Sequence, residues 1–228
     1  MTVLYVPKRR LVFGLLPVLL LGLFAAYSTL ASQPLSGKLI LVDAGHGGVD
    51  SGANQSGIQE KNINLAFALA LKEALQRQGA NVVLSRDQDM ELSGQCDNPR
   101  VKGRYRRDLA ARLEMVTESA ADLFISIHAN ASPDTRRQGV DTYYNPKSAS
   151  GKALAHSIQE ELKKVTVASE KEAPGNYFVL RRNTVPAALI EVGYITHAAE
   201  RNLLQSPEYR ARLVEAIVKG ICSFYQSL

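Results

Sequence analysis

The 228-residue chain has no tryptophan and only two cysteines, Cys96 and Cys222. Two cysteines in a chain of this length exclude a small fold held by several disulfides, and their spacing alone does not tell whether the two pair. Disorder is excluded as well, because 46% of the residues are hydrophobic and the net charge is small. The sequence therefore predicts a protein that folds around an ordinary hydrophobic core.

The chain also lacks a strong charge of one sign. Its formal net charge is +5, and three of the basic residues, Lys8, Arg9 and Arg10, stand together near the N-terminus. Residues 34–228 hold 24 Lys and Arg against 22 Asp and Glu. So small an excess does not provide a surface that tracks nucleic-acid phosphates, and we expect no nucleic-acid partner.

Acidic residues are missing from residues 1–33, where the basic group Lys8–Arg10 precedes a run of 21 uncharged residues, Leu11–Ala31. A basic flank followed by an apolar run is typical of an export segment, which is either cleaved as a signal peptide or kept as a membrane anchor. A buried N-terminal helix of the domain is the third alternative. The first two interpretations place residues 34–228 outside the cytoplasmic membrane as a single domain.

Apolar runs and helical periodicities alternate along the rest of the chain. Alternation of strand and helix predicts an α/β fold, with a mostly parallel sheet covered by helices on both faces. In such sheets, ligands bind at the carboxyl ends of the strands. Glycine-rich and polar stretches at 44–57 and 87–106 predict loops. The expected strands are 38–43, 81–85, 123–128, 140–144, 177–180 and 187–191, and the expected helices are 60–78, 108–120, 149–165 and 206–224.

Two of the four histidines come at strand ends: His46 lies in the glycine-rich loop, and His128 ends the strand at 123–128. Glu60 opens the helix that follows the same loop. Two imidazoles and one carboxylate form a ligand set that leaves a fourth position open, which is the pattern of a catalytic zinc site. This set predicts one Zn²⁺ per chain.

Each of these features also has an ordinary structural explanation. A histidine at a strand end can be a hydrogen-bonded structural residue, and an acid at a helix start can be a favourable helix-terminal charge. A glycine-rich loop can cradle phosphate, although this one lacks both the GKS or GKT ending and the GxGxxG spacing.

A zinc hydrolase also needs a group that transfers protons, and Glu191 is the candidate. It follows four apolar residues at the end of a predicted strand. Burial beside that strand raises the pKa of a carboxyl group, and a zinc charge lowers it, so the balance suits a proton shuttle.

Further strand-end residues are candidates for orienting ligands or contacting substrate: Asp43, Asn130 and Arg86. Arg86 could meet an anionic group of a substrate or form an ordinary surface ion pair. The remaining histidines are expected outside the site, with His156 on the polar face of its helix and His197 near a helix start.

Five segments follow one another in a specific order: LVDAGHGGVDSGA, QEKNINLA, SRD, ADLFISIHANAS and PAALIEVGYITH. In order and spacing this set resembles the zinc-dependent N-acetylmuramoyl-L-alanine amidases, over about residues 37–226. The resemblance implies a mostly parallel six-stranded sheet. It implies that His46, Glu60 and His128 bind zinc and that Glu191 is the catalytic glutamate. The implied reaction is cleavage of the amide bond between N-acetylmuramic acid and the L-Ala of the stem peptide.

Within that family, the short chain, the entry segment PLSGKLILVDAGHGG and the Arg- and Gly-rich loop at 87–107 resemble the germination-specific amidases of the spore cortex. The implied substrate is a peptidoglycan glycan strand with its stem peptide, cleaved as the first step towards muramic-δ-lactam. The implied location is the forespore envelope, where an accessory protein is a further expected partner. Two alternatives stay open: a vegetative cell-wall amidase, and a wall-binding or activator protein on the same fold without hydrolysis.

Overall fold

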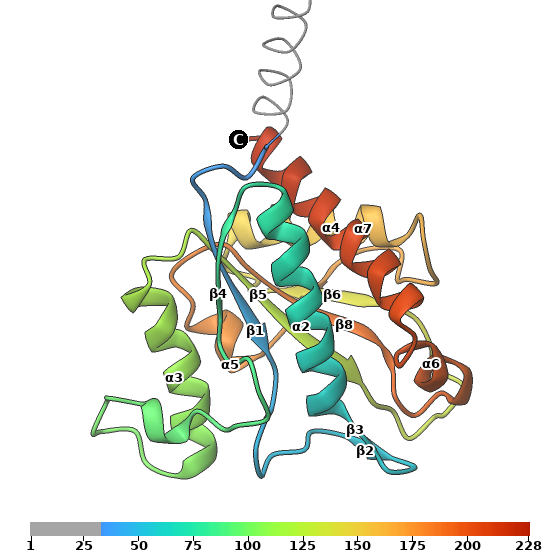
Figure 1. Cartoon of the computed structure of the whole chain (residues 1–228), viewed down its shortest axis with the longest axis horizontal. Coiled ribbons are helices and arrows are strands. Elements are labelled where there is room, and N and C mark those ends of the chain that lie inside the picture. Colours follow the sequence, from blue (N-terminus) through green and yellow to red (C-terminus); the bar gives the residue numbers. More distant parts are fainter. Residues whose placement is uncertain (1–32) are drawn as a thin grey trace, which may run out of the picture. The chain divides into compact units, whose positions relative to one another are not determined.

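Short segments rich in β-branched residues form one six-stranded sheet (Figure 1). Its first four strands run parallel to one another. The fifth is antiparallel to the fourth, and the sixth is parallel to the fifth. The expected α/β fold with a mostly parallel sheet is therefore confirmed. The strands lie in the order β4 (Asn81–Leu84), β1 (Leu39–Ala44), β5 (Leu123–Asn130), β8 (Ala187–Tyr194), β6 (Asp141–Tyr144) and β7 (Ala173–Pro174).

The computed structural model describes residues 33–228. Of the export segment predicted at 1–33, residues 1–32 lie outside the described residues. Residues 35–228 form one unit with its own hydrophobic core. Among the described residues, no helix is both long enough and apolar enough to cross a bilayer.

Alternate residues of the central strands face opposite sides of the sheet, because side chains on a strand alternate with a period of two. On the first side, Ile40, Val42, Ile125 and Ile190 are fully buried. This side is covered by α2 (Glu60–Arg77), α4 (Ala149–Leu162) and α7 (Pro207–Gln226), and α2 and α7 cross in front of the strands in Figure 1. These helices and strands enclose the larger part of the core.

The second side of the sheet carries a smaller apolar layer that includes Leu41, Phe124 and Leu189. It packs beneath α3 (Arg104–Glu118) and α5 (Phe178–Arg181), two helices that contact each other. Because α5 is a single turn, the apolar cover is short on this side. The polar residues at the strand ends lie on this same side.

One expected strand is wrong: residues 177–180 begin the one-turn helix α5. The backbone N–H of Arg181 donates to the carbonyl oxygen of Tyr177 at 3.0 Å. A short apolar run reads the same for a buried strand and a buried helical turn, so the pattern alone does not separate them.

The segment expected as a loop at 87–106 is partly helical. It contains a 3-10 turn, η1 (Ser93–Gln95), and α3 begins at Arg104 rather than at residue 108. The first turn of α3 carries arginines without apolar periodicity, so no hydrophobic pattern marks it as helical. Three short strands were also not expected: β2 (Asn54–Gln55), β3 (Ile58–Gln59) and β7. The helix start expected near His197 is present as α6 (Ala198–Leu203).

Candidate functional site

The polar residues at the strand ends gather on the side of the sheet that α3 and α5 cover. Asp43 in β1 is in register with Ser126 in β5, and His128 in β5 is in register with Glu191 in β8. Residues in register on neighbouring strands point to the same side of a sheet. The fold therefore brings these side chains together at the edge where parallel sheets bind ligands.

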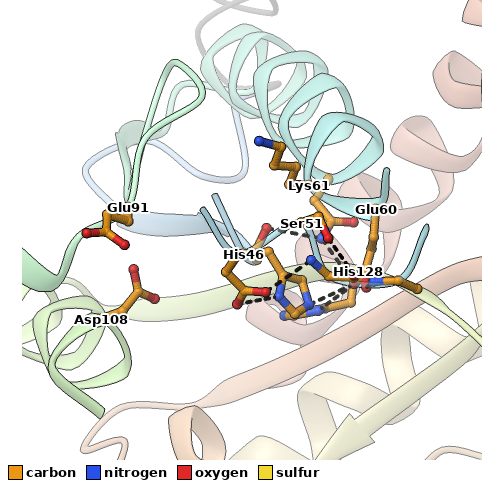
Figure 2. A network of polar contacts seen from close by, with 12 residues as sticks. His46, Ser51, Glu60, Lys61, Glu91, Asp108 and His128 are labelled. Atoms are coloured by element: carbon orange, nitrogen blue, oxygen red, sulfur yellow. Dashed lines mark hydrogen bonds and ion pairs between the residues drawn. The ribbon is translucent and has the colours of Figure 1, made fainter. Parts of the chain in front are cut away.

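Figure 2 shows the side chains of His46, Glu60 and His128 close together. They come from the loop after β1, the first turn of α2 and the later part of β5. Glu60 Oε1 lies 3.2 Å from His46 Nε2 and 2.9 Å from His128 Nδ1. One potential ligand atom of each residue lies within 4.8 Å of the other two. The structure thus brings together the three residues predicted as a metal site.

Glu60 makes more contacts than a helix-terminal charge requires. Its Oε2 accepts a hydrogen bond from the backbone N–H of Ala53 at 2.9 Å, and its Oε1 accepts one from Ala129 at 3.2 Å. Burial disfavours the ionised carboxylate, but hydrogen bonds and charges from His128 and His46 outweigh it and hold the pKa of Glu60 well below its usual value. Glu60 is therefore a carboxylate shared by two imidazoles.

His46 is oriented by a second carboxylate. Its Nδ1 lies 2.8 Å from Asp50 Oδ2, on the opposite side of the ring from Glu60. Burial disfavours the imidazolium, yet Glu60 and Asp50 together raise the pKa of His46 to about 9. The site therefore favours a positive charge between His46 and Glu60. Two imidazole nitrogens and a carboxylate oxygen, with a carboxylate behind one imidazole, form a donor set that fits zinc.

Two glycines allow the cluster to close. A Cβ atom on Gly45 would lie 2.3 Å from the ring of His128, and a Cβ atom on Gly52 would lie 2.5 Å from Glu60 Oε2. Gly52 also has a φ of +62°, in the left-handed region that favours glycine. Close packing around the two histidines thus explains why the loop is rich in glycine, and a phosphate-binding role is not needed to explain it.

Glu191 is a buried carboxyl group with an unsatisfied oxygen. It is 7% exposed, and within the described residues its Oε2 has no hydrogen-bond partner. Burial raises the pKa of Glu191 to about 7, with smaller contributions from the charges of Glu60 and Asp141 and an opposing one from His128. A carboxyl group that changes protonation near neutral pH, one strand away from His128, is suited to proton transfer.

Arg86 does not form the predicted surface ion pair, because it is 2% exposed. Its guanidinium donates to the carbonyl oxygens of Ala44, Gly45 and His46 at 2.9, 3.0 and 2.8 Å. With its donors engaged by the backbone in this way, Arg86 holds the loop that carries His46 instead of facing an anionic group of a substrate.

A second buried arginine, Arg112, supports the same loop. It donates to the carbonyl oxygens of Ala44 and His46 at 2.9 Å each, and it pairs with Asp43 and Asp108. His46 has a φ of 62°, which is uncommon for a residue with a side chain. The two guanidinium groups therefore fix the unusual backbone on which His46 stands.

Arg112 and Asp50 were not among the residues predicted for the site. Arg112 lies on the buried face of α3, four residues after Asp108, and a charge in an apolar stripe with an acid one turn earlier is a detectable signal. Asp50 lies four residues after His46 in a loop, where spacing carries no such information. Of the predicted strand-end candidates, Asp43 pairs with Arg112 and accepts a hydrogen bond from Ser126 at 2.7 Å, so its role is to support the loop.

The other predicted residues lie away from the cluster. Asn130 Oδ1 accepts a hydrogen bond from the next backbone N–H at 2.9 Å, so its side-chain contact is local. His156 is exposed beside Glu172, and His197 caps α6, as expected. Cys96 and Cys222 are both free thiols, which answers the question of whether they pair. No metal ligand or base is added by this group.

A cleft of about 950 Å³ opens over the site. His46 and His128 line it, together with the segment before α3, the first turns of α3 and the residues around α5. Tyr105, which is 61% exposed, and Tyr177 are aromatic members of the lining. A cavity of this size admits a ligand larger than a single amino acid.

Comparisons with known proteins agree on one family. The family model described as N-acetylmuramoyl-L-alanine amidase matches residues 40–223. A germination-specific N-acetylmuramoyl-L-alanine amidase of Bacillus subtilis is 38% identical over 200 residues, covering 85% of this chain and 82% of that protein.

Solved structures give the same result. The CwlD amidase from Clostridioides difficile, in complex with the GerS lipoprotein, has a TM-score of 0.78 at 34% identity, covering 84% of this chain and all of that one. The catalytic domain of CwlV, an N-acetylmuramoyl-L-alanine amidase from Paenibacillus polymyxa, has a TM-score of 0.71 at 31% identity, covering 83% and 98%. This chain therefore belongs to the N-acetylmuramoyl-L-alanine amidase family, whose reaction is hydrolysis of the amide bond between N-acetylmuramic acid and the L-alanine of the stem peptide.

Proposed function

We propose that this amidase is a zinc enzyme in which His46, Glu60 and His128 hold the metal and Glu191 transfers the proton. The observation that carries the proposal is the carboxylate shared by two imidazoles, next to a buried carboxyl group that titrates near neutral pH. Zinc, when bound, polarises the carbonyl under attack and lowers the pKa of water.

The chain's own residues supply orientation and proton transfer. Asp50 holds the ring of His46, and the two buried arginines hold its backbone. Glu191 has a free oxygen and a raised pKa, so it can take a proton from the attacking water and pass it to the departing alanine nitrogen. The cleft lined by His46 and His128 receives the substrate, with its scissile amide at the cluster.

The proposed place of action is the peptidoglycan outside the cytoplasmic membrane, in the spore cortex. The basic and apolar leader at 1–33 supports export, either as a signal peptide or as an anchor. The 38% identical relative is named germination-specific, which supports the cortex over the vegetative wall. The complex of the Clostridioides difficile relative with a lipoprotein supports an accessory partner for this chain too.

Product analysis tests the reaction. Purified protein incubated with cortex peptidoglycan is expected to release whole stem peptides and leave muramic acid without peptide, as read by mass spectrometry of the digest. Products in which L-alanine is still joined to muramic acid would contradict the reaction, and so would intact peptidoglycan, which the wall-binding alternative predicts. In spores that lack the gene, muramic-δ-lactam is expected to be absent, and normal lactam would contradict the cortex role.

The metal assignment has its own prediction. His128→Ala is expected to lose the bound zinc, because it leaves only two of the three protein ligands, and activity falls with it. Elemental analysis after dialysis measures the zinc content, and circular dichroism checks the fold. Asn130→Ala, two residues further along β5 and outside the cluster, is the matched control that keeps its zinc. One equivalent of zinc in His128→Ala would show that the ligand assignment is wrong.

A further inference from the structure

Four exposed basic side chains line the cleft beyond the metal-site cluster: Arg100, Lys102, Arg106 and Arg181. The first three come from the segment before α3 and its first turn, and the fourth is the last residue of α5. Within residues 33–228, none of these four side chains takes part in an ion pair or a side-chain hydrogen bond, whereas the neighbouring Arg104 pairs with Glu91. The four cationic groups are thus available to a ligand.

The acidic residues of the lining are engaged by other groups. Asp43 and Asp108 pair with Arg112, and Asp50 contacts His46. The cleft lining contains five Lys and Arg residues and these three acidic residues. Residues 34–228 as a whole contain 24 Lys and Arg residues and 22 Asp and Glu residues. The remainder of the domain therefore holds 19 residues of each sign. The small positive excess of the domain is located in the cleft lining.

The proposed substrate carries its negative charge on one part only. N-acetylated sugars are neutral, and the carboxyl group of muramic acid is consumed in the amide bond that the enzyme cleaves. The residues of a stem peptide beyond L-alanine carry free carboxylates on their side branches and at the C-terminus. A cationic lining next to the cluster therefore matches the peptide and not the glycan.

We propose that Arg100, Lys102, Arg106 and Arg181 bind the free carboxylates of the stem peptide, so that the enzyme prefers stem peptides whose carboxyl groups are not amidated. This inference rests on the proposed function, because it takes the scissile amide to lie at the cluster. Charge-assisted hydrogen bonds from Arg and Lys to carboxylates are stronger than those to neutral amides. At an exposed position each contact is weak alone, so the preference is a sum over several side chains.

The test compares two soluble muramoyl-peptide fragments that differ only in their peptide carboxyl groups, free in one and amidated in the other. For the wild-type holoenzyme, the KM of the amidated fragment is expected to be about 10-fold higher at low salt, with kcat little changed. Added salt reduces this difference, because it screens exposed charges.

The variant Arg181→Gln and the combined variant Arg100→Gln/Lys102→Gln/Arg106→Gln remove the charges without touching the cluster. We expect the KM of the free-carboxylate fragment to rise about 2-fold in Arg181→Gln and roughly 3- to 5-fold in the combined variant, and the KM of the amidated fragment to stay as in the wild type. Lys219→Gln, an exposed site on α7 at the other side of the sheet, is the matched control and should behave as wild type.

Equal KM values for the two fragments in the wild type would overturn the inference. So would an effect of Lys219→Gln on KM as large as that of the variants in the cleft. Both of these results leave the amidase reaction intact, because both fragments are still cleaved. Failure to cleave either fragment between muramic acid and L-alanine would instead overturn the proposed function on which the inference rests.

Discussion

Replacing Glu191 by Gln is expected to lower kcat by about 10²- to 10⁴-fold, which is the usual contribution of a positioned general base. The amide of Gln keeps the size of the side chain but does not accept a proton at neutral pH. Glu191 is not one of the three clustered donors, so the zinc content should stay near that of the wild type. Steady-state kinetics and elemental analysis on one preparation measure both quantities. An unchanged kcat would assign the base to another residue.

The same variant should be more stable than the wild type at alkaline pH. The pKa of Glu191 is raised from 4.5 to about 7 in the folded chain, so folding favours its protonated form. That stabilisation is fully present below pH 4.5 and is lost as the pH rises through about 7. The loss is on the order of 3 kcal/mol, and Gln does not suffer it.

The stability difference is measured as the Tm of chelator-treated protein, because a bound cation would itself favour the carboxylate. The difference in Tm between Glu191→Gln and wild type should be small at pH 4.5 and should open between pH 4.5 and 7. A constant difference over this range would show that burial does not raise the pKa of this group. Together, the loss of kcat and the gain of stability would identify a residue kept for chemistry at a cost to folding.

Arg112→Met is expected to destabilise the fold by about 3–5 kcal/mol, the usual effect of removing one partner from a buried ion pair. Arg112 and Asp43 are both almost fully buried, and Arg112 holds the pKa of Asp43 below its usual value against the effect of burial. Without the guanidinium, Asp43 is a buried charge whose remaining close partners are the hydroxyl groups of Ser126 and Ser85. Urea unfolding with a two-state fit measures the change.

The double variant Arg112→Met/Asp43→Asn separates the two roles of Arg112. It removes the unpaired charge, so it should recover most of the lost stability. It should not recover zinc affinity, because the carbonyl oxygens of Ala44 and His46 have lost the donors of Arg112 and keep only the hydrogen bonds from Arg86. Recovery of both properties would show that Arg112 has no part in positioning His46, and recovery of neither would show that charge burial is not the cause of the instability.

Residues at strand ends could be predicted from the sequence because the pattern that marks a buried strand also marks where it stops. Both His128 and Glu191 follow such runs, and the parallel register then places them next to each other. Glu60 could be predicted because a helix begins directly after the glycine-rich loop. For these residues, local periodicity and the general geometry of parallel sheets are sufficient.

The remaining features depend on contacts that no local pattern contains. The expected strand at 177–180 is replaced by the helical turn α5, whose Val179 and Leu180 pack in the smaller apolar layer on the second side of the sheet. Arg86 is buried because three consecutive carbonyl groups need donors, and these belong to a loop 40 residues earlier. The orientation of Asp50 towards His46 follows from the turn of that loop, which the sequence does not specify.

The two sides of the sheet have different roles: one packs in the larger core, and the other carries the functional residues. Ile127 and Ile190 of β5 and β8 face the layer of α2, α4 and α7, while their neighbours His128 and Glu191 face the side that α3 and α5 cover. Since adjacent strand residues point in opposite directions, the segment before α3 and the turn α5 can diverge in length and charge without disturbing the larger core. A different stem-peptide preference could therefore be engineered by changing the side covered by α3 and α5, while the sheet and the helices on its other side are kept as they are.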